Sequence, residues 1–220
     1  MKIEESIATL AELPISTPML LPYLAGYKRP YDKIDALVNG GYLYQLRRGL
    51  YVAGPTIKAI HPELFLIANH LYGPSYVTAE SALSYWGLIP EKVTRIISAT
   101  TRKTALFKTQ VGDFHYFHLS NEAYVIGLSQ VQLSDRQTVL MATPEKALCD
   151  LVVQTRGLNL RTVKQTKQFL EEDIRFDIQT VPKLNVSLLA DCVSHCPKSN
   201  SLLLLYKTIQ SYAQTMAGFV

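Results

Sequence analysis

The sequence predicts an α+β fold, because three helical segments and a β-hairpin precede a longer region in which short strands alternate with helices. The chain has 220 residues, of which 48% are hydrophobic and 18% are charged. This is the composition of a folded globular protein, and the length allows one large domain or a small domain followed by a medium one. Glycine and proline interrupt the apolar pattern at regular points and separate the predicted elements.

The first 26 residues predict two helices. Ile3, Ile7 and Leu10 follow helical spacing, so a first helix should end near Leu13. Pro18 suits the first position of a second helix, whose apolar residues lie within 19–24. Pro22 falls inside that second helix and should shorten or distort it.

A third helix and a hairpin follow. Pro30 suits the first helical position, and Gly40 with Gly41 provides the C-terminal stop. Residues 42–46 and 50–53 are rich in Tyr, Val and Leu and predict two strands joined by a tight turn. Three helices and a hairpin in this order predict a winged helix-turn-helix over residues 1–54.

The remainder predicts a second domain over residues 60–220. The segment between Gly54 and Pro62 has the composition of a boundary. Residues 60–142 predict a mixed α/β region, and residues 143–220 a mainly helical one. Strands are expected at 76–78, 95–99, 114–119, near Val125, and as a hairpin of 131–133 with 139–141. Helices are expected at 62–71, 80–86, 143–154, 162–170, 186–193 and 201–216.

Positive charge is concentrated after the first helix. The whole chain carries a net charge of +4, and residues 18–58 hold six basic against two acidic side chains. Residues 61–142 hold six of each sign. This asymmetry favours residues 18–58 as the contact with an acidic polymer such as DNA.

The start of the third helix provides the first group of candidate DNA-binding residues. Recognition helices meet the major groove with their N-terminal residues. Lys28, Arg29, Tyr31 and Lys33 lie there, while the apolar residues of the helix face the core. Arg and Lys contact guanine or phosphate, and Tyr can bond a phosphate. The alternative is a solvated basic helix end without a ligand.

The hairpin turn provides the second group. Arg47 and Arg48 lie at its tip. A wing runs along the DNA backbone or enters the minor groove, where the electrostatic potential attracts Arg. The alternative is a polar turn that is charged for solubility.

Three blocks in register resemble the AbiEi-type antitoxins of type IV toxin–antitoxin systems. The first is residues 37–52 (LVNGGYLYQLRRGLYV), similar to the helix and wing of that family. The second comprises YVT at 76–78, SAL at 81–83 and GL at 87–88, and the third is ATPEKALCDL at 142–151. The resemblance runs from about residue 20 to about residue 155. Pro22 and Pro30 depart from the usual helix-turn-helix pattern of the family.

The resemblance implies a DNA-binding transcriptional autorepressor that is also an antitoxin. The winged helix would bind inverted repeats in its own promoter, which suggests a homodimer on double-stranded operator DNA. The C-terminal domain would counteract a cognate nucleotidyltransferase-like toxin. In the family, a basic face of that domain can also contact DNA. No enzymatic activity is implied.

The residues by themselves are also compatible with two other functions. A nuclease targeted by a winged helix would use Glu145 and Lys146 with a further carboxylate such as Asp113. Asp113 follows Gly112, however, which indicates a turn, and Glu145 is also explained as an acid favourable at a helix N-terminus. The third possibility is a winged helix used for protein contact only.

Metal, cofactor and membrane sites are not predicted. Cys192, His195 and Cys196 lie close together, but a structural zinc site needs four ligands, so we interpret Cys149, Cys192 and Cys196 as buried thiols. His115 and His118 should face opposite sides of a strand. The glycines are isolated and form no phosphate loop. The N-terminus lacks a hydrophobic signal region, so the expected location is the cytoplasm.

Overall fold

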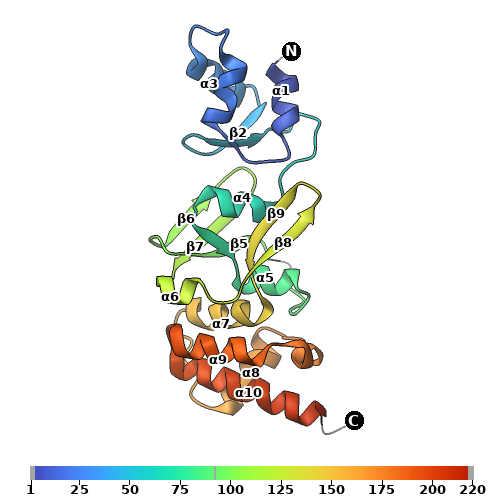
Figure 1. Cartoon of the computed structure of the whole chain (residues 1–220), viewed down its shortest axis with the longest axis vertical. Helices are drawn as coiled ribbons and strands as arrows, with labels where there is room; N and C mark the ends of the chain where they lie inside the picture. Colours follow the sequence, from blue (N-terminus) through green and yellow to red (C-terminus); the bar gives the residue numbers. More distant parts are fainter. Residues whose placement is uncertain (1–2, 92, 218–220) are drawn as a thin grey trace.

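The computed structural model describes residues 3–91 and 93–217 and shows a mixed α+β protein. N-terminal helices with a small three-stranded antiparallel sheet are followed by a six-stranded mixed sheet and then by C-terminal helices. These three parts are stacked along the long axis of the molecule (Figure 1). Among the helices of the described ranges, none combines the length and the apolar character needed to cross a membrane.

The N-terminal unit contains the predicted helices and hairpin. Its elements are α1 (Ile3–Leu10), β1 (Ile15–Ser16), α2 (Thr17–Leu20), the 3₁₀ turn η1 (Leu21–Leu24), α3 (Pro30–Asn39), β2 (Leu43–Arg47) and β3 (Leu50–Ala53). The strands pair antiparallel in the order β1-β3-β2. Pro22 has the predicted effect, because the α-helix ends at Leu20 and the chain continues as a 3₁₀ turn. Strand β1 was not predicted, since two residues give no periodicity.

The second unit is built on the six-stranded sheet, in the order β6-β7-β5-β4-β9-β8. Its strands are β4 (Ser75–Val77), β5 (Arg95–Thr100), β6 (Ala105–Lys108), β7 (Asp113–His118), β8 (Leu128–Ser134) and β9 (Gln137–Ala142). Its helices before β8 are α4 (Leu64–Leu71), α5 (Ala79–Tyr85) and α6 (Asn121–Tyr124). Helix α4 lies on the side of the sheet that faces the N-terminal unit, and α5 lies on the other side with α7 (Figure 1).

Three local predictions in this unit are wrong. The strand expected near Val125 is the short helix α6, which Ser120 caps by accepting a hydrogen bond from the Ala123 N–H. Val125 follows that helix and is exposed, so its β-branched side chain does not mark a strand. Asp113 is the first residue of β7 and not part of a turn. Strand β6 was missed because only four residues pair, at an edge of the sheet.

The predicted C-terminal helices are confirmed. They are α7 (Pro144–Gln154), α8 (Val163–Gln168), α9 (Val186–His195) and α10 (Ser199–Ala217). The π turn η2 (Phe169–Asp173) extends α8, and the 3₁₀ segment η3 (Ile178–Lys183) precedes α9. Thr143 caps α7 as expected, since its hydroxyl accepts a hydrogen bond from the Lys146 N–H and Pro144 occupies the first turn.

The hairpin β2–β3 lies between two hydrophobic cores. Buried residues of the N-terminal unit form one cluster, which Tyr51 and Ala53 of β3 join. Leu50 and Val52, on the opposite face of the same strand, belong to the larger core of the second unit, together with Leu46 of β2. Because side chains alternate along a strand, both faces of the hairpin are covered and the hairpin connects the two units.

Polar contacts from the β8–β9 turn reinforce this connection. Arg136 Nη1 lies 3.3 Å from Glu12 Oε2, just after α1. The Gln137 side chain accepts a hydrogen bond from the Glu63 N–H at 2.8 Å and donates one to the His61 carbonyl at 3.3 Å. The segment between the two units is therefore held against the sheet by side chains that the sequence pattern did not single out.

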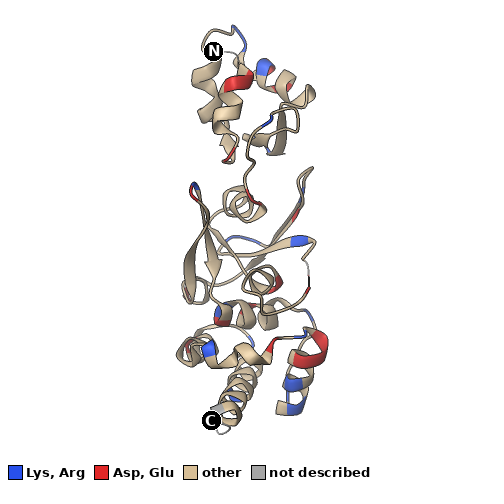
Figure 2. Cartoon of the chain, turned by 90° about the vertical axis from the view of Figure 1, so that its right-hand side faces the viewer, with Lys and Arg blue, Asp and Glu red and all other residues tan. Residues whose placement is uncertain are grey.

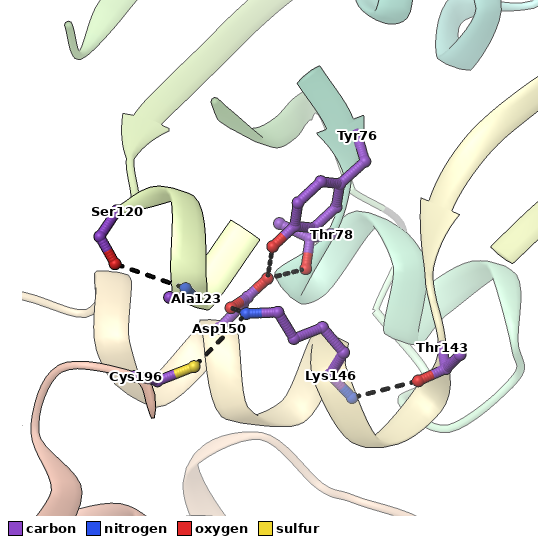
Figure 3. A network of polar contacts seen from close by, with 8 residues as sticks. All are labelled: Tyr76, Thr78, Ser120, Ala123, Thr143, Lys146, Asp150 and Cys196. Carbon is purple, nitrogen blue, oxygen red and sulfur yellow. Dashed lines mark hydrogen bonds and ion pairs between the residues drawn. The ribbon is translucent and has the colours of Figure 1, made fainter. Parts of the chain in front are cut away.

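A buried ion pair joins the C-terminal helices to the sheet. Lys146 Nζ lies 2.6 Å from Asp150 Oδ1, and both side chains are 0% exposed. The other Asp150 oxygen accepts hydrogen bonds from the hydroxyls of Tyr76 and Thr78 in and next to β4, each at 2.8 Å. Lys146 Nζ also lies 3.6 Å from the Cys196 sulfur at the end of α9 (Figure 3). The network therefore connects β4, α7 and α9.

This network fixes the charge state of its members. Burial by itself lowers the pKa of Lys146, but the Asp150 carboxylate outweighs burial and the pKa is raised. Burial and the neighbouring Asp150 raise the pKa of Tyr76 well above its ordinary value. Because the pKa of Lys146 is raised in the folded chain, the ion pair stabilises the fold fully at pH values below the ordinary lysine pKa of about 10.4. This stabilisation is lost as the pH rises further.

Removing one member of the Lys146–Asp150 pair should lower the free energy of unfolding by much more than the intact pair contributes to it. We expect Asp150→Asn or Lys146→Met to lower the free energy of unfolding by about 3–5 kcal/mol, because each leaves a buried group without its partner. The double variant Lys146→Met/Asp150→Asn should lose less than the sum of the single changes. Urea unfolding at pH 7 measures all three. The control is Asp32→Asn, which breaks an exposed ion pair and should cost less than about 1 kcal/mol. Strictly additive losses would contradict the coupling.

Candidate nucleic-acid interface

Helix α3 presents a polar end to solvent. Pro30 occupies its first turn, and its apolar side chains Ile34 and Leu37 are buried in the N-terminal core. Three predicted site residues therefore point outward: Lys28 and Arg29 are exposed, and Tyr31 is 62% exposed. The amphipathic pattern of this helix determines which side chains are free for a ligand.

Two of the cations at this end are oriented by neighbours. Lys33 is half-buried, and its Nζ lies 5.4 Å from the centre of the Tyr27 ring. Arg29 Nη1 lies 3.5 Å from Asp32 Oδ2 on the next turn. Both contacts are weak at an exposed site, so the side chains can be redirected to a phosphate at little cost.

The hairpin turn is fixed to the start of α2. Gly49 has a φ of +78°, a conformation that strongly favours glycine and that closes the turn between β2 and β3. The Thr17 N–H donates a hydrogen bond of 3.0 Å to the Gly49 carbonyl. The position of Arg48, directly before Gly49, is therefore set by the backbone of α2.

A hollow of about 490 Å³ brings these elements together. Tyr31 and Asp35 of α3 line one side, and Gln45 and Arg48 of the hairpin line the other, with Thr17 beside them. All are donors or acceptors of hydrogen bonds, as a surface that meets base edges and phosphates requires. Tyr31 and Arg48, predicted separately from the helix and from the turn, thus share one concave surface.

Arg47 belongs to a different environment. The register of the hairpin shifts between Gln45 and Arg47, so the alternation of side chains is broken there. Burial raises the pKa of the Tyr116 hydroxyl in β7, and the charge of Arg47 opposes that rise. Arg47 is exposed but lies toward the second unit and does not line the hollow. The structure therefore places only one of the two hairpin arginines beside α3.

Sequence reasoning missed three residues of the hollow. Asp35 lies one turn after Tyr31, and Gln45 lies on the exposed side of β2. Both could have been found from helical and strand periodicity. Thr17 could not, because its place depends on the tertiary contact with Gly49. Figure 2 shows basic residues at the far end of the N-terminal unit, and basic and acidic residues mixed over the C-terminal helices.

The candidate nuclease residues are occupied by structural contacts. Glu145 is 5% exposed and its Oε1 accepts a 2.7 Å hydrogen bond from the Asn185 N–H at the start of α9. Lys146 is held by Asp150 as described, and Asp113 pairs opposite Lys108 at the start of β7. Glu145 therefore lies in the first turn of α7 as expected, and it additionally supports α9.

The cysteines and histidines are likewise held in the fold. Cys149, Cys192 and Cys196 are buried free thiols. Hydrogen bonds with neighbouring thiols, together with burial, raise the pKa of Cys192 and of Cys196, so both stay protonated. Residues 3–91 and 93–217 contain no group of three or more His, Cys, Asp or Glu side chains placed to hold a metal ion.

No protein-family model matches the chain, and no curated protein matches its sequence.

Proposed function

We propose that the chain is a DNA-binding transcriptional repressor that contacts duplex DNA through α3 and the β2–β3 turn. The observation that carries the proposal is the order α1-β1-α2-α3-β2-β3 with sheet order β1-β3-β2, which agrees with the element order that a winged helix would have. The exposed cationic end of α3 and the hollow that it shares with Arg48 support the same conclusion.

In this proposal α3 enters the major groove with its N-terminal end. Arg29 and Lys33 contact base edges, where a bidentate arginine–guanine pair contributes about 1–3 kcal/mol of discrimination. Tyr31 and Arg48 hold phosphates on either side of the hollow. Asp35 can accept a hydrogen bond from the amino group of cytosine and would repel a phosphate placed at the same point.

The resemblance to AbiEi-type antitoxins extends the proposal to autorepression and antitoxicity. The N-terminal unit binds inverted repeats in its own promoter as a homodimer, and the second unit counteracts a nucleotidyltransferase-like toxin. A separate core built on a six-stranded sheet and its helices supports a second task, because a winged helix binds DNA without such an addition.

The salt dependence of binding tests the proposed contact. If the net charge of +4 over residues 18–58 neutralises about four phosphates, the log–log slope of affinity against salt should be about −3.6. Arg48→Ala should reduce that slope by about 0.9 and weaken binding to cognate and random duplexes alike. Fluorescence anisotropy with both duplexes measures this.

Arg47→Ala is the matched control, because it removes the same charge from the neighbouring position outside the hollow. It should leave the slope nearly unchanged. Equal effects of the two substitutions, or binding that does not respond to salt, would contradict the assignment of the hollow to DNA.

A second experiment separates repression from antitoxicity in the full chain. Arg29→Ala/Arg48→Ala should abolish repression of a promoter reporter but keep the growth rescue of cells that express the toxin, because both residues are exposed on the N-terminal unit. Parallel loss of repression and rescue, at unchanged protein level, would show that one surface serves both tasks and that the division between the units is wrong.

A further inference from the structure

A cleft of the second unit lies on the face of its sheet that is turned away from α3. Helices α5 and α7 pack against the sheet at β5 and β9, and the outer strands β6 and β7 extend beyond them. The space that remains has a volume of about 640 Å³, within the range of small-molecule sites. Figure 1 places α7 and the N-terminal unit on opposite sides of the sheet, so DNA bound at α3 does not reach this cleft.

The cleft carries two arginines that form no ion pair with a carboxylate among the described residues, and the charge of Arg95 partly opposes the rise in the pKa of Glu80 in the same cleft. Arg95 at the start of β5 and Arg156 just after α7 both line it and are exposed. Neither is among the ion pairs of residues 3–91 and 93–217. Burial and the nearby charge of Arg95 lower the pKa of His115, which also lines the cleft, so this imidazole is neutral at pH 7. The guanidinium groups are free to bind an anion bidentately.

The floor of the cleft is apolar, and the wall formed by α5 and the end of α7 carries polar side chains. Ile97, Leu106 and Phe117 give the floor an apolar surface, and Leu106 is 52% exposed although it is a large hydrophobic residue. On the wall, the Gln154 side chain donates to both oxygens of the Glu80 carboxylate, at 3.2 and 3.4 Å. Burial raises the pKa of Glu80, which marks a carboxylate partly removed from water.

We propose that this cleft binds a nucleoside monophosphate. The phosphate would lie on Arg95 and Arg156, and the ring on the apolar floor at Leu106. The hydrogen-bonding edge of the base would meet the adjacent acceptor and amide of Glu80 and Gln154. The phosphate, the ring and the edge of the base would thus each meet side chains of matching chemistry. The inference does not depend on the DNA-binding role of the N-terminal unit.

Calorimetric titration of the full chain tests this site. The probes are AMP, GMP, CMP and UMP, with the four corresponding nucleosides and inorganic phosphate as separate arms. At least one monophosphate should bind saturably with a Kd below about 1 mM, and its nucleoside and inorganic phosphate should each bind at least tenfold more weakly, because each lacks one half of the matched ligand.

Variants identify the site of binding. Arg95→Ala and Arg156→Ala should each weaken the monophosphate at least tenfold without changing Tm, because both side chains are exposed. Arg161→Ala, an exposed arginine outside the cleft, and Arg48→Ala in the N-terminal hollow should bind as the parent chain does. The proposal is overturned if no monophosphate saturates, if inorganic phosphate binds as tightly, or if Arg95→Ala and Arg156→Ala bind normally.

Discussion

The burial of both faces of the β2–β3 hairpin is the constraint on which the rest of the structure depends. Tyr51 and Ala53 pack into the small N-terminal core, and Leu50 and Val52 pack into the core of the second unit. A hairpin with one solvated face would be free to move relative to the six-stranded sheet. Here it is part of the boundary between two cores, so its tip, with Arg48, is held in a fixed place relative to α3 and to the six-stranded sheet. A small domain with few buried residues gains stability from the same contact.

Much of the fold could be predicted because local signals agree with the tertiary structure. Pro22 shortened α2, Pro30 began α3, and Thr143 with Pro144 began α7 as their backbone chemistry requires. The failures occur where pairing or packing decides. Strand β6 exists because β7 is beside it, and Val125 follows a helix that Ser120 begins.

The residues of the candidate interface likewise divide into those that the local sequence pattern predicts and those whose place depends on tertiary contacts. Tyr31 is exposed as the helical periodicity of α3 predicts, and Lys28 and Arg29 are exposed directly before the helix. The difference between Arg47 and Arg48 depends on a register shift in the hairpin and could not be predicted from their adjacency. The block around Glu145 and Lys146 is explained by burial: its charges join α7 to β4 and α9 through Asp150 and Asn185. An i,i+4 Lys–Asp pair usually indicates a solvated helix face, and only the surrounding sheet and helices make it internal.

The most direct test of the account is an NMR titration of the ¹⁵N-labelled full chain with a duplex from its own upstream region, at low salt. The account predicts that backbone shifts concentrate at the start of α3, at Thr17 and at the Arg48–Gly49 turn. The amides of α9 and α10 should stay unchanged. Shifts concentrated on the C-terminal helices, or a duplex that leaves α3 and the hairpin turn unperturbed, would contradict the assignment of the N-terminal surface to DNA.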